Sequence, residues 1–547
     1  MGFDLTNFRD APLDAAYLQY LIEQEGPDTA GRFGRLWDYF ANPLRPLSGP
    51  VADAADGCAR PYVQAQEMGL PARITGFNRH GGRTRPADRR RKEVVIENDI
   101  AWRIHAMVDF LFGRGITVRS QAEDPTLAAT IDAVVAALLE ANGGVRFCQE
   151  MALFGAVYGF VDIALRAPAG ESVADVGSLR PAGPGGDGSP AAVVAERSPR
   201  APLRPGPPAS SGRSAESVRP SERAPGLRRR QAAAAARCIA LECIEAGRVL
   251  PVLDPDDYRQ VRCWVQHYRK RLPRVDPARR RWFAPARSRD AAPVAVEVVE
   301  ILSPTWWQRY EDRALVDEGP NALGRLPVVH VQNVSLPGRY GGLSDVEPLV
   351  PLQDELNTRL SDRASRVTFQ SFKMYLGKGI DDFLERPVAP GQMWSTHNLD
   401  ACIEEFGSDA AAPSEDTHIA ELRRALDKVS AVTPLAAGLI EGNVGHLTSA
   451  TALRVVLGGL LARTQRKRLT YGAGLARLVE LALAWLDRTG VLPTRAEDRR
   501  VEIDWPGLLP ADESEQLRNA LTKTQLGVPA DRVLAELGYA RDATGVA

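Results

Sequence analysis

The chain of 547 residues lacks the short motifs that mark most enzymes and metal proteins. It has no H-E-x-x-H and no G-x-S-x-G pattern, and none of its glycine-rich stretches has the spacing of a phosphate-binding loop. Its six cysteines include no C-x-x-C pair, and the spacing of Cys238 and Cys243 is poor for zinc. The sequence therefore predicts reduced structural cysteines, no metal, no cofactor, no catalytic residues and no enzymatic activity.

A signal peptide and a long apolar run are also missing. The first residues, MGFDLTNFRDAP, have neither the basic start nor the apolar core of a secretory signal. The most apolar window, residues 475–486, is interrupted by Arg477 and Glu480 and is too short to cross a bilayer. We therefore expect a soluble protein made in a reducing compartment, with no membrane partner.

The chain also has little net charge, −1 at neutral pH with a pI near 6.7. Proteins that grip nucleic acid tightly are usually distinctly basic, so this balance disfavours a repressor or a histone-like protein. It suits a conduit, because each phosphate neutralised adds affinity and would slow the passage of DNA. The basic run at residues 89–92 is better explained as a solvated turn or an ion pair between subunits than as a DNA contact.

At this length the chain should form several modules of an α+β fold. Apolar spacing predicts helices over 13–25, 31–41, 94–112, 127–141 and 147–158. Residues 180–230 are rich in Pro and Arg and poor in large apolar side chains, so they are predicted to be irregular. Alternating and β-branched runs from 237 to 334 then predict an antiparallel sheet. The acidic residues Asp254, Asp256 and Asp257 are expected to shape a turn rather than to bind a metal.

The most informative stretch lies between Gly324 and Gly379. A β-branched strand over 328–334 ends in a turn rich in Pro and Gly, and a helix follows. Its apolar residues recur at intervals of three and four, at Leu349, Leu352, Leu356, Leu360, Ala364 and Val367. A strand over 372–376, a helix over 416–432, a glycine-bearing loop over 436–447 and a long helix to about 487 come next. The sequence therefore predicts a strand, a helix, a short β segment, a second helix, a glycine-bearing loop and a long helix, in this order.

The ordered series from 321 to about 490 resembles the portal proteins of tailed bacteriophages, of the type found in siphophages and myophages. The resemblance implies a portal fold that assembles as a ring, with long stem and wing helices, a β-rich wing and a small α/β clip. It implies this division: wing 1–342 with a low-complexity insert at about 166–236, first stem helix 343–371, clip 372–414, second stem helix 415–435, tunnel loop 436–447, long wing or crown helix 448–490, and a C-terminal wing strand and crown helices 491–547.

The resemblance also implies a function. A dodecameric ring at one capsid vertex would let double-stranded DNA enter and leave, without sequence preference. Its partners would be further copies of itself, the terminase large subunit, a head–tail adaptor, and the major capsid and scaffolding proteins. The protein would reside in the virion, and in the host cytoplasm during assembly. Two other classes remain open, another head–tail adaptor or capsid protein and, less favoured, a packaging ATPase subunit.

Two sets of residues are candidates for the site. In the tunnel loop, glycines make changes of backbone conformation cheap, and the resemblance implies that this loop faces the channel: Gly442, Asn443, Val444, Gly445 and His446. The alternative is an ordinary connection between helices. In the first stem helix, Arg359, Arg363 and Arg366 share one side and are expected to contribute stem or channel charges and contacts between neighbouring copies.

Overall fold

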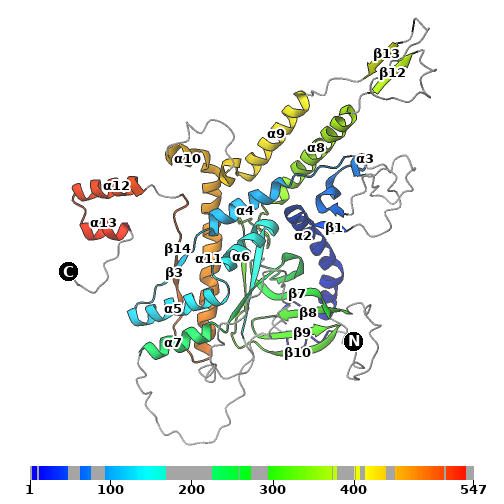
Figure 1. Cartoon of the computed structure of the whole chain (residues 1–547). Helices are drawn as coiled ribbons and strands as arrows, with labels where there is room; N and C mark the ends of the chain where they lie inside the picture. Colours follow the sequence, from blue (N-terminus) through cyan, green and yellow to red (C-terminus); the bar gives the residue numbers. More distant parts are fainter. Residues whose placement is uncertain are drawn as a thin grey trace, which may run out of the picture. The chain divides into compact units, whose positions relative to one another are not determined.

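The structure is a computed structural model. It describes residues 3–8, 11–46, 62–75, 93–167, 225–257, 259–272, 294–371, 374–378, 400, 402–406, 413–438, 450–509 and 513–537. Helices and strands are mixed along the chain, as expected for the α+β class (Figure 1). The chain divides into two compact units. Unit 1 comprises Met1–Gly34, His105–Ser344 and Pro434–Ala547, and unit 2 comprises Arg35–Ile104 and Asp345–Thr433.

Unit 1 contains an antiparallel five-stranded sheet in the order β10-β9-β8-β7-β6. The strands are β6 (Val249–Leu253), β7 (Val261–Leu272), β8 (Val294–Leu302), β9 (Trp306–Glu311) and β10 (Ala314–Pro320). Successive side chains of a strand point to opposite faces, and β7 shows this clearly. Cys263 and Val265 pack under the N-terminal segment with Leu18 and Leu21, whereas Trp264 packs on the other face beside Trp307. The predicted antiparallel sheet is confirmed, and both of its faces are covered.

The second face meets a three-stranded sheet of order β11-β4-β5, formed by β4 (Phe160–Arg166), β5 (Ala240–Ile244) and β11 (Val328–Gln332). Two buried polar contacts join the sheets. The indole Nε1 of Trp264 donates to Asp162 over 2.8 Å, and the guanidinium of Arg166 donates to both oxygens of Glu300 over 2.5 and 2.8 Å. Asp162, Arg166 and Glu300 are each at most 4% exposed. The pairing supplies the partners that buried charges need.

The N-terminal helices depart from the prediction of two separate helices. Helix α1 (Ala15–Tyr20), the π-helical turn η1 (Leu21–Glu25) and α2 (Gly26–Ala41) follow one another without a break. Pro27 lies just after the π turn. Proline lacks an N–H and clashes with the carbonyl four residues earlier in an α-helix, and a wider turn relieves that clash. The helix therefore continues through a position where the sequence suggested an end.

Helices α5 (Pro125–Ala141) and α6 (Val145–Tyr158) confirm two predicted helices. Strand β3 (Thr117–Ser120) pairs with β14 (Val501–Asp504). The prediction that residues 180–230 are irregular is wrong at its end, because α7 spans Pro225–Ala236 and packs on α5. Its alanines form the contact, since Ala232, Ala235 and Ala236 are at most 1% exposed. Alanine is the best helix former, and it allows close packing. Residues 168–224 of the insert lie outside the described part of the chain.

The long helix predicted over 448–490 is two helices, α10 (Ala450–Val456) and α11 (Gly458–Arg488). Leu457 interrupts the helical backbone with a ψ of 3°, and Gly458 and Gly459 follow it, where helix propensity is low. Helix α11 is long and apolar enough by composition to span a bilayer. However, 61% of its apolar window is buried within the protein, as in a core helix. The chain continues through η12 (Glu497–Arg499), α12 (Glu513–Gln525) and α13 (Ala530–Glu536).

Unit 2 is built mainly on two helices, α8 (Val350–Ser371) and α9 (Pro413–Ser430), with η8 (Glu347–Leu349) before α8. Between them, β12 (Met374–Lys378) pairs antiparallel with β13 (Cys402–Phe406), so the order is helix, hairpin, helix (Figure 1). The N-terminal part of the unit adds a two-stranded ribbon and two short helices: β1 (Leu44–Pro46), β2 (Tyr62–Gln64), η3 (Ala65–Gly69) and α3 (Ala72–Thr75).

Helix α4 (Asp99–Phe112) begins five residues later than the predicted helix over 94–112. Residues 93–98 are not helical. The side-chain oxygen of Asn98 accepts from the amide of Ala101 over 3.3 Å, which is the bond of a helix N-cap. The reason for the extended segment lies in its contacts with α8, described below. The remaining short turns in unit 1 are η6 (Ala246–Arg248) and η10 (Pro434–Ala437).

Candidate functional site: the paired helices of unit 2

Helices α8 and α9 lie side by side and run in opposite directions (Figure 1). The end of α8 meets the start of α9, because Arg363 pairs with Asp416 over 3.2 Å and Arg366 pairs with Glu415. The spacing of apolar residues in α9 predicts one buried face formed by Ile419, Leu422, Leu426 and Val429. The first three are buried, whereas Val429 is 40% exposed. The two-stranded hairpin therefore follows at the end of the antiparallel helix pair where α8 finishes and α9 begins.

The three candidate stem arginines all have partners inside the chain. Arg359 contacts Glu355 over 2.7 Å, one turn earlier on α8, and Arg363 and Arg366 reach the acidic first turn of α9. These side chains are about one third to one half exposed. Exposed ion pairs contribute about 0–1 kcal/mol each. Arg363 and Arg366 thus join α8 to α9, whereas Arg359 pairs with acids of α8 itself.

The apolar stripe of α8 makes up only part of its buried surface. Leu356 of that stripe is completely buried, but Val367, near the end of the helix, is 49% exposed. Three polar side chains, Gln353, Asn357 and Ser361, are also completely buried. These three polar residues recur every four positions and therefore lie on one side of the helix. Their side chains must hydrogen-bond in the interior, because an unpaired buried polar group costs about 1–3 kcal/mol.

Their partner is the backbone of the extended segment 95–99. Three contacts repeat along it: Ser361 accepts from the amide of Val95 (3.0 Å), Asn357 from that of Glu97 (3.0 Å), and Gln353 from that of Asp99 (3.1 Å). The Gln353 amide also donates to the carbonyl of Glu97 over 2.5 Å. Four helical residues rise about 6.0 Å and two extended residues about 6.6 Å, so the two repeats match. We call these contacts the α8 ladder.

The ladder continues into a buried network around Gln66 in η3, which has no exposed surface. The amide of Asn357 donates to Gln66 over 2.9 Å, and the amide of Gln66 donates to Asn98 and to the carbonyl of Tyr39. All of these residues belong to unit 2. The network fixes η3, the start of α4 and α8 relative to one another through directional bonds.

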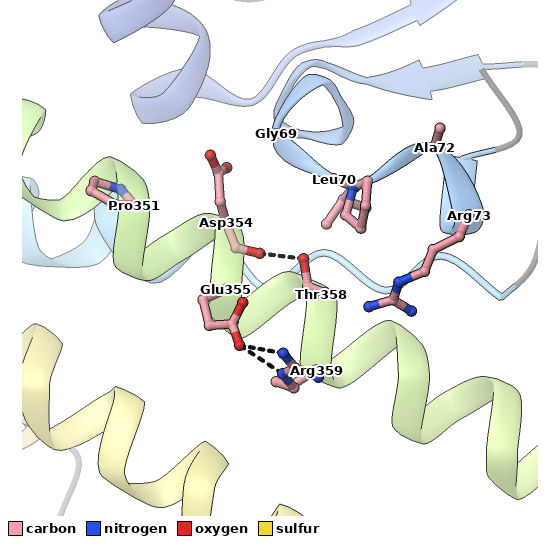
Figure 2. A pocket seen from close by; sticks show the side chains of 10 residues that line it. Gly69, Leu70, Ala72, Arg73, Pro351, Asp354, Glu355, Thr358 and Arg359 are labelled. Atoms are coloured by element: carbon pink, nitrogen blue, oxygen red, sulfur yellow. Dashed lines mark hydrogen bonds and ion pairs between the residues drawn. The ribbon is translucent and has the colours of Figure 1, made fainter. Parts of the chain in front are cut away.

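A groove of about 730 Å³ lies beside this network, between η3–α3 and α8 (Figure 2). At its edge, the hydroxyl of Tyr39 donates to Asp354 over 2.6 Å. Burial, and next the adjacent Asp354 carboxylate, raise the pKa of Tyr39, so the phenol stays protonated. A Cβ on Gly69 would lie only 1.8 Å from Asp354 Oδ1 and 2.6 Å from the Tyr39 hydroxyl. Glycine permits this close approach of η3 to α8.

The charges of the groove are paired with one another. Glu355 binds Arg359, as Figure 2 shows, and Arg73 of α3 binds Asp362 of α8 through both carboxylate oxygens. The hydrogen bonds that Arg73 donates to Asp362 raise the pKa of Arg73. Because both arginines that line the groove, Arg73 and Arg359, have carboxylate partners, the arrangement suits a contact surface better than a site for an anionic small molecule.

At the other end of unit 2, Arg103 of α4 is 1% exposed and binds three acceptors. It donates to Asp427 of α9 over 2.7 Å, to the carbonyl of Val432 over 3.0 Å, and to Asp99 over 3.1 Å. Its guanidinium carbon also lies 4.2 Å from the centre of the Trp102 ring. The sequence analysis did not identify Arg103 or the α8 ladder. The available signal was the spacing of Gln353, Asn357 and Ser361 inside a helix that was read only for its apolar residues.

The tunnel-loop candidates Gly442, Asn443, Val444, Gly445 and His446 lie outside the described residues.

Metal binding and thiol chemistry have little support among the described residues. No group of three or more His, Cys, Asp or Glu there could hold a metal ion. Asp254 accepts from the amides of Asp256 and Asp257, which confirms the predicted turn. Burial raises the pKa of Cys148 and of Cys263 to about 12, so both thiols stay protonated at neutral pH.

Comparison with known proteins gives one family. Residues 242–537, more than half of the chain, match the family described as "Phage portal protein, SPP1 Gp6-like". A chain from the solved structure titled "Virion of native gene transfer agent (GTA) particle" is similar over 80% of this chain and 93% of its own length, with 11% identity and a TM-score of 0.36. No curated protein matches. The matched range of the family includes α8, the β12–β13 hairpin and α9.

Proposed function

Because this chain belongs to the phage portal protein family, a family of structural virion proteins without enzymatic activity, we propose that it forms the DNA channel of a virion. Twelve copies would form a ring at one capsid vertex. Double-stranded DNA would enter through this ring during packaging and leave through it on ejection. The observation that carries the proposal is the helix–hairpin–helix of unit 2, which lies inside the range matched by the family.

A ring requires each copy to place one surface against a different surface of the next copy. The α8–α9 pair is suited to this role because its two helices are fixed to each other within one chain. The three arginines of α8 already have carboxylate partners within the chain. Burying them between two copies would therefore not leave unpaired charges at the interface. Arg424 and Lys428 on the opposite side of α9 are exposed and are candidates for contacts with the neighbouring copy.

The same pairing suits a conduit. Arginines that bind DNA phosphates release counterions and hold the duplex, whereas arginines neutralised by adjacent acids bind it weakly. Arg359, Arg363 and Arg366 each have a carboxylate beside them. We infer that they give the stem a nearly neutral surface along which DNA slides. The loop 436–447 would then touch the duplex without holding it, and its residues 442–446 are the proposed channel-facing tip.

The remaining partners follow from the ends of the helix pair. The β12–β13 hairpin would form the clip and would bind the terminase large subunit during packaging. The head–tail adaptor would replace the terminase afterwards, and the major capsid and scaffolding proteins would contact unit 1. Assembly would take place in the host cytoplasm.

Imaging of the purified chain by negative-stain electron microscopy tests the proposal. Rings with a central hole are expected. A monomer or a particle without a hole under all assembly conditions would contradict it and would favour a different head–tail adaptor or capsid protein. An ATPase assay would expose a packaging ATPase subunit.

The role of the loop needs a second experiment. Deletion of residues 442–445 should leave rings intact and reduce DNA packaging, because the loop would no longer reach the duplex. A replacement of the same four residues by Ser-Gly-Ser-Gly keeps the length and serves as the matched control. Normal packaging by the deletion variant would remove the role assigned to this loop.

A further inference from the structure

The end of α9 has an unusual backbone. The helix ends at Ser430, and the next residue, Ala431, has a φ of 57°. Left-handed backbone at a helix end is normally supplied by glycine, since a Cβ makes it strained. The hydroxyl of Ser430 accepts from the amide of Val432 over 3.1 Å. A strained residue of this kind persists when its surroundings hold it in place.

Arg103 is the side chain that holds it. One guanidinium nitrogen, Nη1, donates both to Asp427, in the last turn of α9, and to the carbonyl of Val432, just after the strained residue. The two acceptors therefore lie on either side of Ala431 and are bound to the same atom. The turn between them cannot open without breaking a charge-assisted hydrogen bond in a buried position.

The arginine is itself fixed from the other side. Its second nitrogen, Nη2, donates to Asp99, and Asp99 accepts at its other carboxylate oxygen from the Trp102 indole over 2.7 Å. The amide of Asp99 donates to Gln353, the first member of the α8 ladder. The end of α9 is therefore linked through Arg103 and Asp99 to α8, across three separate stretches of sequence within unit 2.

We propose that Arg103 is a positioning residue that fixes the direction in which the chain leaves α9. Its importance for packaging rests on the proposed function, in which the segment starting at residue 436 leads to the channel. A guanidinium is suited to this task because its planar fork can reach acceptors on two sides at once. A lysine at this position keeps the charge and reaches fewer acceptors with fixed geometry.

The test compares Arg103→Lys with Arg45→Lys in the full-length chain. Arg45 lies on β1 of unit 2 with its side chain 55% exposed, so the second variant makes the same chemical change away from the contact. Hydrogen exchange of the amides at 430–438 should become at least about tenfold faster in Arg103→Lys, because a hydrogen bond to a charged group is lost. Arg45→Lys should exchange as the original chain does. Both variants should form rings, and only Arg103→Lys should package less DNA.

The outcomes distinguish the positioning role of Arg103 from the proposed role of the following loop in the channel. Unchanged exchange at 430–438 in Arg103→Lys overturns the positioning role, whatever the packaging result. Faster exchange there with normal packaging supports the positioning role and contradicts the channel role of the following loop. Equal acceleration throughout unit 2 would show a general structural role and would also overturn the proposal. If Arg103→Lys does not fold, Asp427→Asn replaces it, because that variant keeps the contacts of Arg103 with Asp99 and Val432.

Discussion

The two units of this chain differ in the side chains that hold their main elements together. In unit 1, the five-stranded sheet is covered on both faces by apolar side chains, with Trp264 and Trp307 at most 1% exposed. In unit 2, the side chains with no exposed surface include Gln66, Gln353 and Asn357. Apolar burial is non-directional, whereas hydrogen bonds require fixed angles and distances. Unit 1 also contains buried directional contacts, such as that of Arg166 with Glu300, but they lie beside a large apolar core. In unit 2, buried side-chain hydrogen bonds join α8 to the backbone of residues 95–99, so the geometry of single contacts matters more there.

This difference suits the proposed roles. A helix pair that lines a channel must keep its orientation as DNA passes. A network of hydrogen bonds with fixed angles and distances favours one orientation of the helices over all others. Apolar cores tolerate volume-conserving exchanges, whereas a partly satisfied polar network is costly. We expect conservative changes to be tolerated better in unit 1 than in the α8 ladder.

The largest effect is expected from removing a core side chain of unit 1. Trp264→Ala should destabilise the unit by about 3–5 kcal/mol, because it leaves a cavity and removes a donor from Asp162. Urea dependence of hydrogen exchange in β7 and β8 measures this change. Trp306→Ala is the control, since that indole is only partly buried. Equal effects of the two variants would show that the core is not organised around Trp264.

A smaller effect is expected in the α8 ladder, and it sharpens the comparison. Asn357→Leu keeps a similar volume but leaves the amide of Glu97 and the carbonyl oxygen of Gln66 unpaired. The expected cost is about 2–4 kcal/mol, read from the exchange rates of amides 95–99. Thr358→Val is the control, because the hydroxyl of Thr358 bonds only the carbonyl of Asp354 in its own helix. If Asn357→Leu is neutral, unit 2 does not depend on directional contacts.

The smallest effect is expected for the ion pairs between α8 and α9. Arg363→Gln should cost at most about 1 kcal/mol at low salt and less as salt increases, because the pair with Asp416 is about half exposed. Thermal unfolding at two salt concentrations measures it, and Asp416→Asn should behave in the same way. A cost above 2 kcal/mol that persists at high salt would mean that these arginines do more than align the helices.

Much of the order of elements was predictable from the sequence. Strand β11, helices α5, α6 and α9, and the strands of the antiparallel sheet were expected near their observed positions, because each has a strong local pattern. The start of α4 was not predictable in this way. Residues 94–98 continue the apolar periodicity of the helix, but they bond to side chains of α8 about 260 residues away. Local propensity contains no information on such partners.

The candidate site shows the same limit. Sequence reasoning identified α8 and its three arginines, and it expected these arginines to serve contacts between copies. It did not show that Arg363 and Arg366 find partners on α9 of the same chain. It also missed Arg103. Asp99, one helical turn earlier, is a local sign of one acceptor, but nothing near Arg103 in the sequence indicates Asp427 or Val432.

The sequence by itself determined the order of helices and strands, the resemblance to portal proteins and the absence of the common enzyme motifs. It did so because hydrophobic period and turn residues act over a few neighbouring positions. Only the tertiary structure decided that a polar face of α8 is buried, where α4 begins and what Arg103 binds. Those outcomes depend on which distant backbone groups lie within about 3 Å of a side chain. That proximity exists only once the chain has folded.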